Sequence, residues 1–288
     1  MHPSVIPNSL RREANHAWEG FVSFVPSPRV LTAEDLRTLD YAAEHEFGIP
    51  PAVLMENAAL HAARLIESTA PGPVLVLCGS GNNGGDGYAL TRLLATRGIN
   101  ARAAPITDPN ALTGPAAMNH IAALRLGLLT TPHPGTPHAD HAIALLQSGD
   151  HHTAVEAILG TGLGRPIEGT LAELIGSLND SRRTGTVRRT IALDIPSGLH
   201  AASGAPLGAI NADLTITFAA SKQGFGEITA QPHLGEIALV PIGVPNAIIT
   251  RFGHPLPDQP TALWRQAHRE HNRTTAPEHP AAGRDATP

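Results

Sequence analysis

The chain has 288 residues, of which 42% are hydrophobic and 16% charged, and its formal net charge at pH 7 is −5. This apolar share supports a sizeable core and excludes a wholly disordered chain. No apolar run reaches the ~18 residues of a membrane span, no basic run is dense enough to bind nucleic acid, and a single cysteine excludes a disulfide framework.

Composition divides the chain into three parts. Residues 1–28 lack the apolar run of a secretory signal, which predicts a partly flexible extension on a cytoplasmic protein. Residues 251–288 are rich in Pro, His and Arg, which predicts a disordered tail, although 262–271 could form a helix on a partner. The remaining residues, 29–250, suffice for one α/β domain.

The predicted elements of the first half begin with a helix that Thr32 can cap and that runs through Leu36, Leu39 and Ala43. Next come a helix over 53–66 and a continuous apolar run at 74–78, which is typical of a strand buried on both faces. A glycine-rich turn at 79–87 then leads into a helix that ends at Gly98.

In the second half, strands and helices keep alternating. We expect strands at 99–106, 154–159, 190–195, 214–218 and 237–240, and helices at 114–128, within 131–152, and around 171–178. This alternation predicts a Rossmann-like three-layer αβα sandwich with a mostly parallel central sheet. Ligands of such sheets bind beyond the carboxyl ends of the strands.

Three segments fall at such strand ends. The first reads GSGNNGGDG over 79–87, where glycines let the backbone approach a ligand and a following helix offers free N–H groups to an anion. In the alternative interpretation, Asn82, Asn83 and Asp86 only stabilise turns. An NAD dehydrogenase is disfavoured, because the ribose-binding acid that it requires is missing from 99–104.

The second segment, VEAILGTGLGRP over 155–166, places Glu156 in an apolar strand, where it needs a partner or a cation unless it faces solvent. Its turn offers backbone N–H groups, and Arg165 could meet a phosphate. The third, LDIPSG over 193–198, ends a strand with Asp194, a candidate acid–base group or a turn cap. Ser197 could supply an oxygen to a cation.

Two other chemistries are disfavoured by spacing. A Ser–His–Asp hydrolase would need a G-x-S-x-G elbow, which is missing. The 16 histidines are scattered without the spacing of metal ligands.

Together and in this order, GSGNNGGDGYALTRLL, VEAILGTGLGRPIEGTLAELI and ALDIPSGL resemble the YjeF N-terminal domain family of NAD(P)H-hydrate epimerases. Supporting matches are 31–34, 54–58 and 212–218, and the resemblance covers about 30–245. Lys222, the only lysine beside nineteen arginines, follows the last match. The resemblance implies an isomerase that interconverts the R and S forms of hydrated NADH and NADPH.

The resemblance also implies roles for individual residues. Asp194 is the expected catalytic residue, and K⁺ is the expected ion, held by Asn83, Glu156 and Ser197. The family commonly has Asp where this chain has Glu156, so the carboxylate lies one methylene further out. The expected substrate-binding residues come from all three segments: Asn82, Asn83, Gly84, Gly85, Asp86, Gly160, Thr161, Gly162, Leu163, Gly164, Arg165, Pro166 and Asp194.

Partners follow from the same resemblance. We expect a homodimer, with an ADP- or ATP-dependent dehydratase for the S epimer on a separate protein, because the chain ends soon after the match. One alternative is a non-catalytic nucleotide-binding or protein-interaction module on the same fold, which would be expected to lose Asp86 and Asp194. Another is an unrelated nucleotide-binding enzyme with the same loop.

Overall fold

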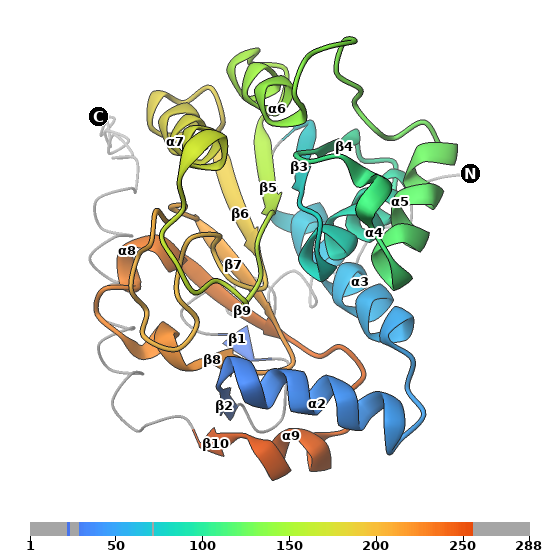
Figure 1. Ribbon diagram of the computed structural model, residues 1–288, viewed down its shortest axis with the longest axis vertical. Coiled ribbons are helices and arrows are strands. Elements are labelled where there is room, and N and C mark those ends of the chain that lie inside the picture. Colours follow the sequence, from blue (N-terminus) through green and yellow to red (C-terminus); the bar gives the residue numbers. More distant parts are fainter. Residues whose placement is uncertain (1–21, 24–28, 71, 256–288) are drawn as a thin grey trace, which may run out of the picture. The chain divides into compact units, whose positions relative to one another are not determined.

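The computed structural model describes residues 22–23, 29–70 and 72–255. The helices and strands of the described residues alternate along most of the chain (Figure 1). In chain order they are β1 (Val22–Ser23), β2 (Arg29–Leu31), α2 (Ala33–His45), α3 (Pro51–Thr69), β3 (Val74–Cys78), α4 (Asn82–Thr96), β4 (Ala101–Pro105), the 3₁₀ helix η1 (Pro109–Ala111), α5 (Gly114–Arg125), α6 (His138–Gln147), β5 (Thr153–Ala157), α7 (Gly169–Thr184), β6 (Arg189–Leu193), β7 (Leu214–Phe218), β8 (Ser221–Lys222), the 3₁₀ helix η2 (Gln223–Gly226), α8 (Gln231–Leu234), β9 (Glu236–Val240), α9 (Asn246–Phe252) and β10 (His254–Pro255).

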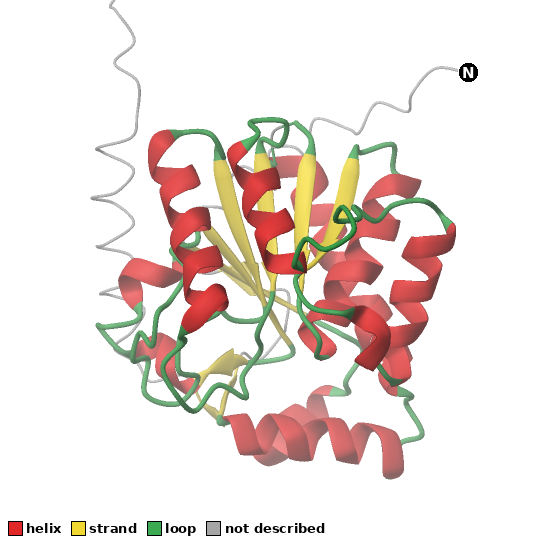
Figure 2. Cartoon of the chain, turned by 45° about the horizontal axis from the view of Figure 1, so that its top comes forward, coloured by secondary structure: helices red, strands yellow, loops and turns green. Residues whose placement is uncertain are grey.

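The main sheet has seven strands in the order β1-β9-β7-β6-β5-β3-β4, and every neighbouring pair is parallel. Figure 2 shows these strands fanned side by side between helices. This confirms the predicted Rossmann-like α/β class. All carboxyl ends of a parallel sheet lie along one edge, so residues that follow β3, β5, β6 and β7 come close in space.

The two faces of β3 pack against different helices. Leu75 and Leu77 belong to a core cluster that includes Leu146 of α6 and Leu174 of α7. Successive strand side chains point to opposite faces, so Val76 and Cys78 face the other way. There the backbone of α4 lies close, because a Cβ on Gly87 would be 2.8 Å from the Sγ atom of Cys78.

One predicted boundary is wrong. The glycine-rich segment 79–87 was expected to be a turn, but α4 already begins at Asn82. Its glycines lie in the first turns of the helix, where their missing side chains allow close contact with the sheet and with neighbouring helices. The predicted N-terminal cap of α2 is confirmed: the Thr32 hydroxyl accepts the backbone N–H of Asp35, and the Thr32 N–H donates to the Asp35 carboxylate.

A second, small sheet was not predicted. Its order is β10-β2-β8, with β2 parallel to β8 and antiparallel to β10. Leu31 of β2 packs with Leu39 of α2 and Ile248 of α9, and these elements lie side by side at the lower edge of Figure 1. The small sheet therefore brings α2 and Lys222 to the same region.

The predicted flexible extension and disordered tail fall mainly outside the described residues. Within them, β1 pairs with β9, and Arg251 and Phe252 belong to α9. Among the described helices, none combines the length and the hydropathy needed to cross a bilayer.

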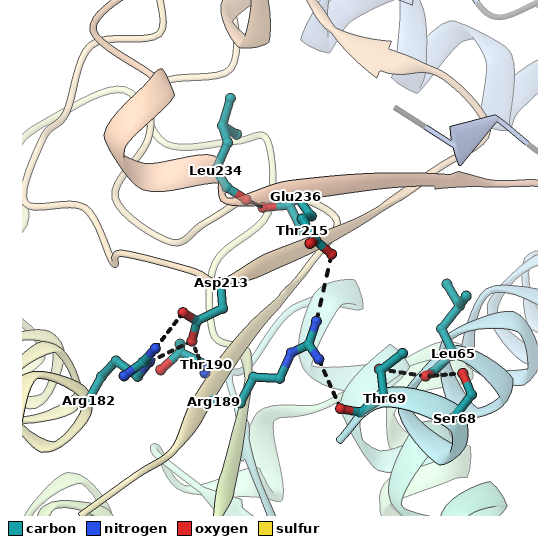
Figure 3. A network of polar contacts seen from close by, with 10 residues as sticks. All are labelled: Leu65, Ser68, Thr69, Arg182, Arg189, Thr190, Asp213, Thr215, Leu234 and Glu236. Carbon is teal, nitrogen blue, oxygen red and sulfur yellow. Dashed lines mark hydrogen bonds and ion pairs between the residues drawn. The ribbon is translucent and has the colours of Figure 1, made fainter. Parts of the chain in front are cut away.

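The amino ends of β6, β7 and β9 carry a network of ion pairs and hydrogen bonds, shown in Figure 3. The Nε and Nη2 groups of Arg182 donate to the two carboxylate oxygens of Asp213, at 2.7 and 2.8 Å. Asp213 also accepts the backbone N–H of Thr190 at 2.8 Å. Arg189 donates to the carbonyl oxygen of Thr69 at 2.8 Å and lies 3.8 Å from Glu236. This network joins strand ends that lie opposite the predicted site.

Candidate active site

The three predicted segments follow β3, β5 and β6, which are neighbours in the sheet. The structure therefore brings the segments together along one edge. Asn83, Gly84, Gly85 and Asp86 are buried and Asn82 is exposed. In the turn after β5, Gly160, Thr161 and Leu163 are half-buried, whereas Gly162, Gly164, Arg165 and Pro166 are exposed.

Asn83 connects all three strand ends. Its Nδ2 group donates to the carbonyl oxygen of Leu159 at 3.0 Å and to that of Leu193 at 3.1 Å. Its Oδ1 atom is buried and has no hydrogen-bond partner among the described residues. A buried, unpaired acceptor is costly, so this oxygen is available to a ligand or cation. Asn83 lies in a helix, which excludes the interpretation that it only stabilises a turn.

Gly85 has a structural role that the sequence did not reveal. A Cβ at this position would lie 2.7 Å from the terminal methyl of Met55 and 2.9 Å from the Cα of Ala116. The glycine thus lets α4 pack closely against α3 and α5. By contrast, a Cβ on Gly162 or Gly164 would meet nothing within 4 Å, so the turn after β5 leaves open space.

Glu156 is completely buried, which excludes the alternative that it faces solvent. Its carboxylate accepts the backbone N–H of Ser197 at 2.8 Å, the Ser197 hydroxyl at 2.6 Å and the N–H of Ile158 at 3.3 Å. Burial raises the pKa of Glu156 to about 7, although these hydrogen bonds oppose the shift. Ser197 also accepts the N–H of Leu159 at 2.8 Å. Two of the predicted ion ligands, Glu156 and Ser197, are thus in contact, and the backbone of Leu159 links Ser197 to the third, Asn83.

Asp194 lies at a strained point directly after β6. Its φ of 65° is in the left-handed region, and the N–H of Ile195 donates to the carbonyl oxygen of Leu193 at 2.8 Å across it. The same three-residue turn ends the neighbouring β7, where Ala219 has a φ of 60° and the N–H of Ala220 donates to the carbonyl oxygen of Phe218 at 2.6 Å. Such three-residue turns are rare for residues with side chains, and they redirect the chain at both strand ends.

The ammonium group of Lys222 contacts Asp194 directly. It also donates to the Thr217 hydroxyl at 2.8 Å and lies 3.4 Å from the carbonyl oxygens of Phe218 and Ala220. The Lys222 side chain is 1% exposed, whereas that of Asp194 is 19% exposed. A buried cation therefore contacts a carboxylate whose side chain is partly exposed to solvent.

Two further carboxyl groups face this pair. Burial raises the pKa of Asp86 well above its usual range, and the charges of Asp194 and Asp40 add to the effect. The pKa of Asp40 is raised to about 6, first by lost hydration and then by the charge of Asp194. The charge of Asp194 thus acts on two other aspartates, whereas Lys222 contacts Asp194 alone among the three.

The sequence did not identify Asp40 as part of the site. It belongs to the amphipathic helix α2, where an exposed acid next to buried Leu39 looks like any solvated side chain. Only its position between the matched segments 31–34 and 54–58 could have drawn attention to it. Lys222 was noted as the only lysine, but its contact with Asp194 depends on the folding of β7 and β8.

The fold and these contacts define a Rossmann-like α/β protein with a carboxylate-rich site at the carboxyl edge of its sheet. The model of the family described as YjeF-related protein N-terminus matches residues 51–224. The chain belongs to this family.

Named relatives are similar over most of the chain. It is 36% identical over 224 residues to the NAD(P)H-hydrate epimerase of Rhodopirellula baltica, which covers 77% of this chain and 87% of that protein. The epimerase of Limosilactobacillus fermentum is 34% identical and is covered over 94% of its length. The bifunctional NAD(P)H-hydrate repair enzyme Nnr of Thermanaerovibrio acidaminovorans is 35% identical over 219 residues, but the chain spans only 41% of it.

Among solved structures, that of the yeast protein ynu0 superposes with a TM-score of 0.66 at 18% identity. The similarity covers 80% of this chain and 96% of the yeast one. At this identity the comparison supports the fold.

Proposed function

We propose that this protein is an NAD(P)H-hydrate epimerase, an isomerase that interconverts the R and S forms of hydrated NADH and NADPH. The observation that carries the proposal is the position of Asp194, which is held by Lys222 at the edge where three glycine-containing or polar segments converge. Epimerase relatives that match most of the chain support the same reaction.

The substrate-binding role is assigned to the two loops. The amino end of α4 directs free backbone N–H groups toward the edge of the sheet, which suits a pyrophosphate. The turn 160–166 offers open space and the exposed guanidinium of Arg165, which forms no ion pair within the described residues. No side chain in this assignment selects a ribose hydroxyl, so both NADH and NADPH hydrates fit.

The chemistry requires that water leave the hydrated carbon and return to its other face, with a proton transferred to and from the oxygen. The C–O bond breaks with its electron pair on oxygen, the hydroxyl takes a proton and leaves as water, and water adds to the other face and gives a proton back. Nothing is consumed. Asp194 is assigned as the acceptor of the returning proton, because it is the carboxylate with both a fixed cation and access to solvent. Burial raises the pKa of Asp86 well above its usual range, which makes Asp86 the carboxyl group better suited to hold a proton at neutral pH.

The residues fit a hard monovalent cation such as K⁺. The unpaired Oδ1 atom of Asn83, the Glu156 carboxylate and the oxygens of Ser197 are all oxygen ligands and lie on three adjoining strand ends. When bound, the ion would supply positive charge beside Glu156. The protein's part is to fix the turn 160–166 through the hydrogen bonds of Leu159 with Asn83 and Ser197.

The remaining assignments concern the protein's surroundings. We propose a homodimer in the cytoplasm that supplies the S epimer to an ADP- or ATP-dependent dehydratase. The length of the bifunctional relatives beyond the matched part supports such a coupling.

The decisive test is incubation of the full chain with R-NADHX, with and without potassium, followed by chiral separation of the hydrates. Appearance of the S epimer is the expected result. Binding of the nucleotide without conversion would overturn the assignment and favour the non-catalytic module instead.

Substitution Asp194→Asn tests the catalytic residue. It removes the charge but keeps the shape, so we expect the turnover number to fall at least ~100-fold while the dissociation constant for the hydrate changes less than ~3-fold. Chiral chromatography and calorimetry give the two values. Turnover within ~3-fold of the original would contradict the role of Asp194.

A further inference from the structure

Lys222 is a buried cation beside the site, with a side chain that is 1% exposed, and the reaction scheme above gives it no step. A buried lysine normally loses its charge or finds strong acceptors, because removal of an ammonium group from water is costly. Here the acceptors are of two kinds. One is the carboxylate of Asp194, and the others all belong to β7 and its end.

The acceptors outnumber the three N–H bonds of the ammonium group. Thr217, Phe218 and Ala220 surround Nζ from the strained turn that ends β7, and Asp194 approaches from the strained turn that ends β6. The lysine thus links two strand ends whose backbones both depart from the regular conformation. Its aliphatic stem begins in β8, which is held by pairing with β2.

Charged groups reach Asp194 from every neighbouring element. Asp40 comes from α2, Asp86 from α4 and Glu156 from β5, and the charge of Asp194 raises the pKa of all three. Lys222 lowers the pKa of Asp40 and Asp86, against these effects. It is the only cation that contacts Asp194 within residues 29–70 and 72–255.

We propose that Lys222 is a positioning residue for the epimerase reaction, which holds the Asp194 carboxylate in one orientation. The inference rests on the proposed function. Without the lysine, the carboxylate would lose the cation that contacts it, and a neighbouring positive charge favours the charged form of an acid. The carboxylate would also be free to rotate about its side-chain bonds, so fewer molecules would be ready to accept the proton from returning water.

The test measures turnover of R-NADHX by the full chain between pH 4 and 9. In Lys222→Met, which keeps the aliphatic stem and removes the charge, we expect turnover at pH 7 to fall ~100-fold. The Michaelis constant should change less than ~3-fold, and the acid limb of the profile should move up by at least ~1 pH unit. If that variant does not fold, Lys222→Gln provides the same comparison.

Two matched variants separate positioning from a merely structural role. Lys222→Arg keeps the charge, so its acid limb should stay near that of the original chain, but the planar guanidinium cannot repeat the compact contacts and turnover should fall ~10-fold. Arg182→Met breaks the ion pair at the opposite end of the sheet and should lower thermal stability without moving the profile.

The outcomes are distinguishable. An original chain that does not convert R-NADHX would overturn the proposed function itself. An active original chain together with an unshifted profile in Lys222→Met, or Lys222→Gln, would overturn the role of Lys222 alone. A profile that shifts equally in Arg182→Met would show that lost stability, and not the lysine, is responsible.

Discussion

The pKa of an acidic side chain at this site depends on its loss of hydration and on the charges close to it. Asp40 is an example, because it is exposed by area and yet its pKa lies near 6. Nearby protein atoms reduce the hydration of its carboxyl group, and the charge of Asp194 raises its pKa further. Whether a surface carboxylate is ordinary therefore depends on its neighbours and not on its exposure alone.

We predict a pH-dependent effect for Asp40→Asn. The raised pKa means that the folded chain holds this proton more tightly than the unfolded chain. The favourable contribution to stability is therefore fully present below pH ~4 and is lost as the pH rises through ~6. The asparagine variant should unfold at a higher temperature than the original at pH 7, by no more than ~2 °C because solvent screens the site, and the gain should vanish at pH 4. Thermal unfolding at both pH values is the measurement, and an equal gain at pH 4 would contradict the prediction.

Asp213 illustrates a polar contact with a structural role. Replacement by Ala leaves both Arg182 and the Thr190 N–H without their acceptor, so we expect the free energy of unfolding to fall by ~2 kcal/mol. Glu236→Ala is the matched control, since its 3.8 Å contact with Arg189 should be worth less than ~0.5 kcal/mol. Urea denaturation would measure the free energy of unfolding of both variants. Similar losses in the two would contradict the larger structural role of the Asp213 contacts.

At the scale of elements, the ends of β6 and β7 are the unusual features. Both strands continue their hydrogen bonding by one residue, to Asp194 and Ala219, and then turn sharply with positive φ. Glycine would adopt this backbone more easily, but glycine could not supply the Asp194 carboxylate. The fold thus accepts local strain where it needs a side chain at the edge of the sheet.

Ala219→Val tests that strain. A β-branched residue fits a positive φ poorly, and the position is buried, so we expect a loss of ~3 kcal/mol. Ala192→Val, buried in the neighbouring β6 with ordinary strand geometry, should lose only the ~1–2 kcal/mol of overcrowding. Denaturant unfolding of both variants gives the difference. Equal losses would mean that the turn at Ala219 is not strained.

The sequence predicted the elements that carry strong patterns. The apolar run at 74–78 and the i, i+3, i+4 spacing around Leu171 needed no tertiary information, and both were confirmed as β3 and α7. The small sheet was missed because strands of two or three residues have no detectable period. The start of α4 was missed because glycine signals a turn unless close packing requires it.

The residues of the candidate site also include some that the sequence marks and others that it does not. Asn83, Glu156, Asp194 and Ser197 could be selected because they stand beside strand ends or within an apolar strand. Asp40 and the partner of Lys222 could not, because their importance comes from charges on other elements. The backbone of Leu159 is a further contributor that no sequence pattern would mark, since its carbonyl oxygen and N–H take part through geometry alone.

For the molecule as a whole, ion binding should contribute to stability. A ligand that binds only the folded chain stabilises it, and potassium at ten times its dissociation constant would add ~1.4 kcal/mol, or ~3–5 °C in unfolding temperature. We expect that shift for potassium chloride relative to choline chloride at equal concentration. Asn83→Ala removes the unpaired oxygen and should abolish the difference between the salts. A shift that persists in the variant would place the ion elsewhere.

The order of strands also sets when the site can exist during folding. The first five-residue strand along the chain is β3, which lies second from one edge of the sheet; β4 follows at that edge, and β5, β6 and β7 are then added on the other side of β3. Asn83 meets a carbonyl group 110 residues further along the sequence. Contacts of such long range form slowly. A chain emerging from the ribosome can therefore form β3 and α4 early, but the contact between Asp194 and Lys222 forms only after β8 has docked. Recovery of activity on refolding would then report the last long-range contacts rather than the first helices.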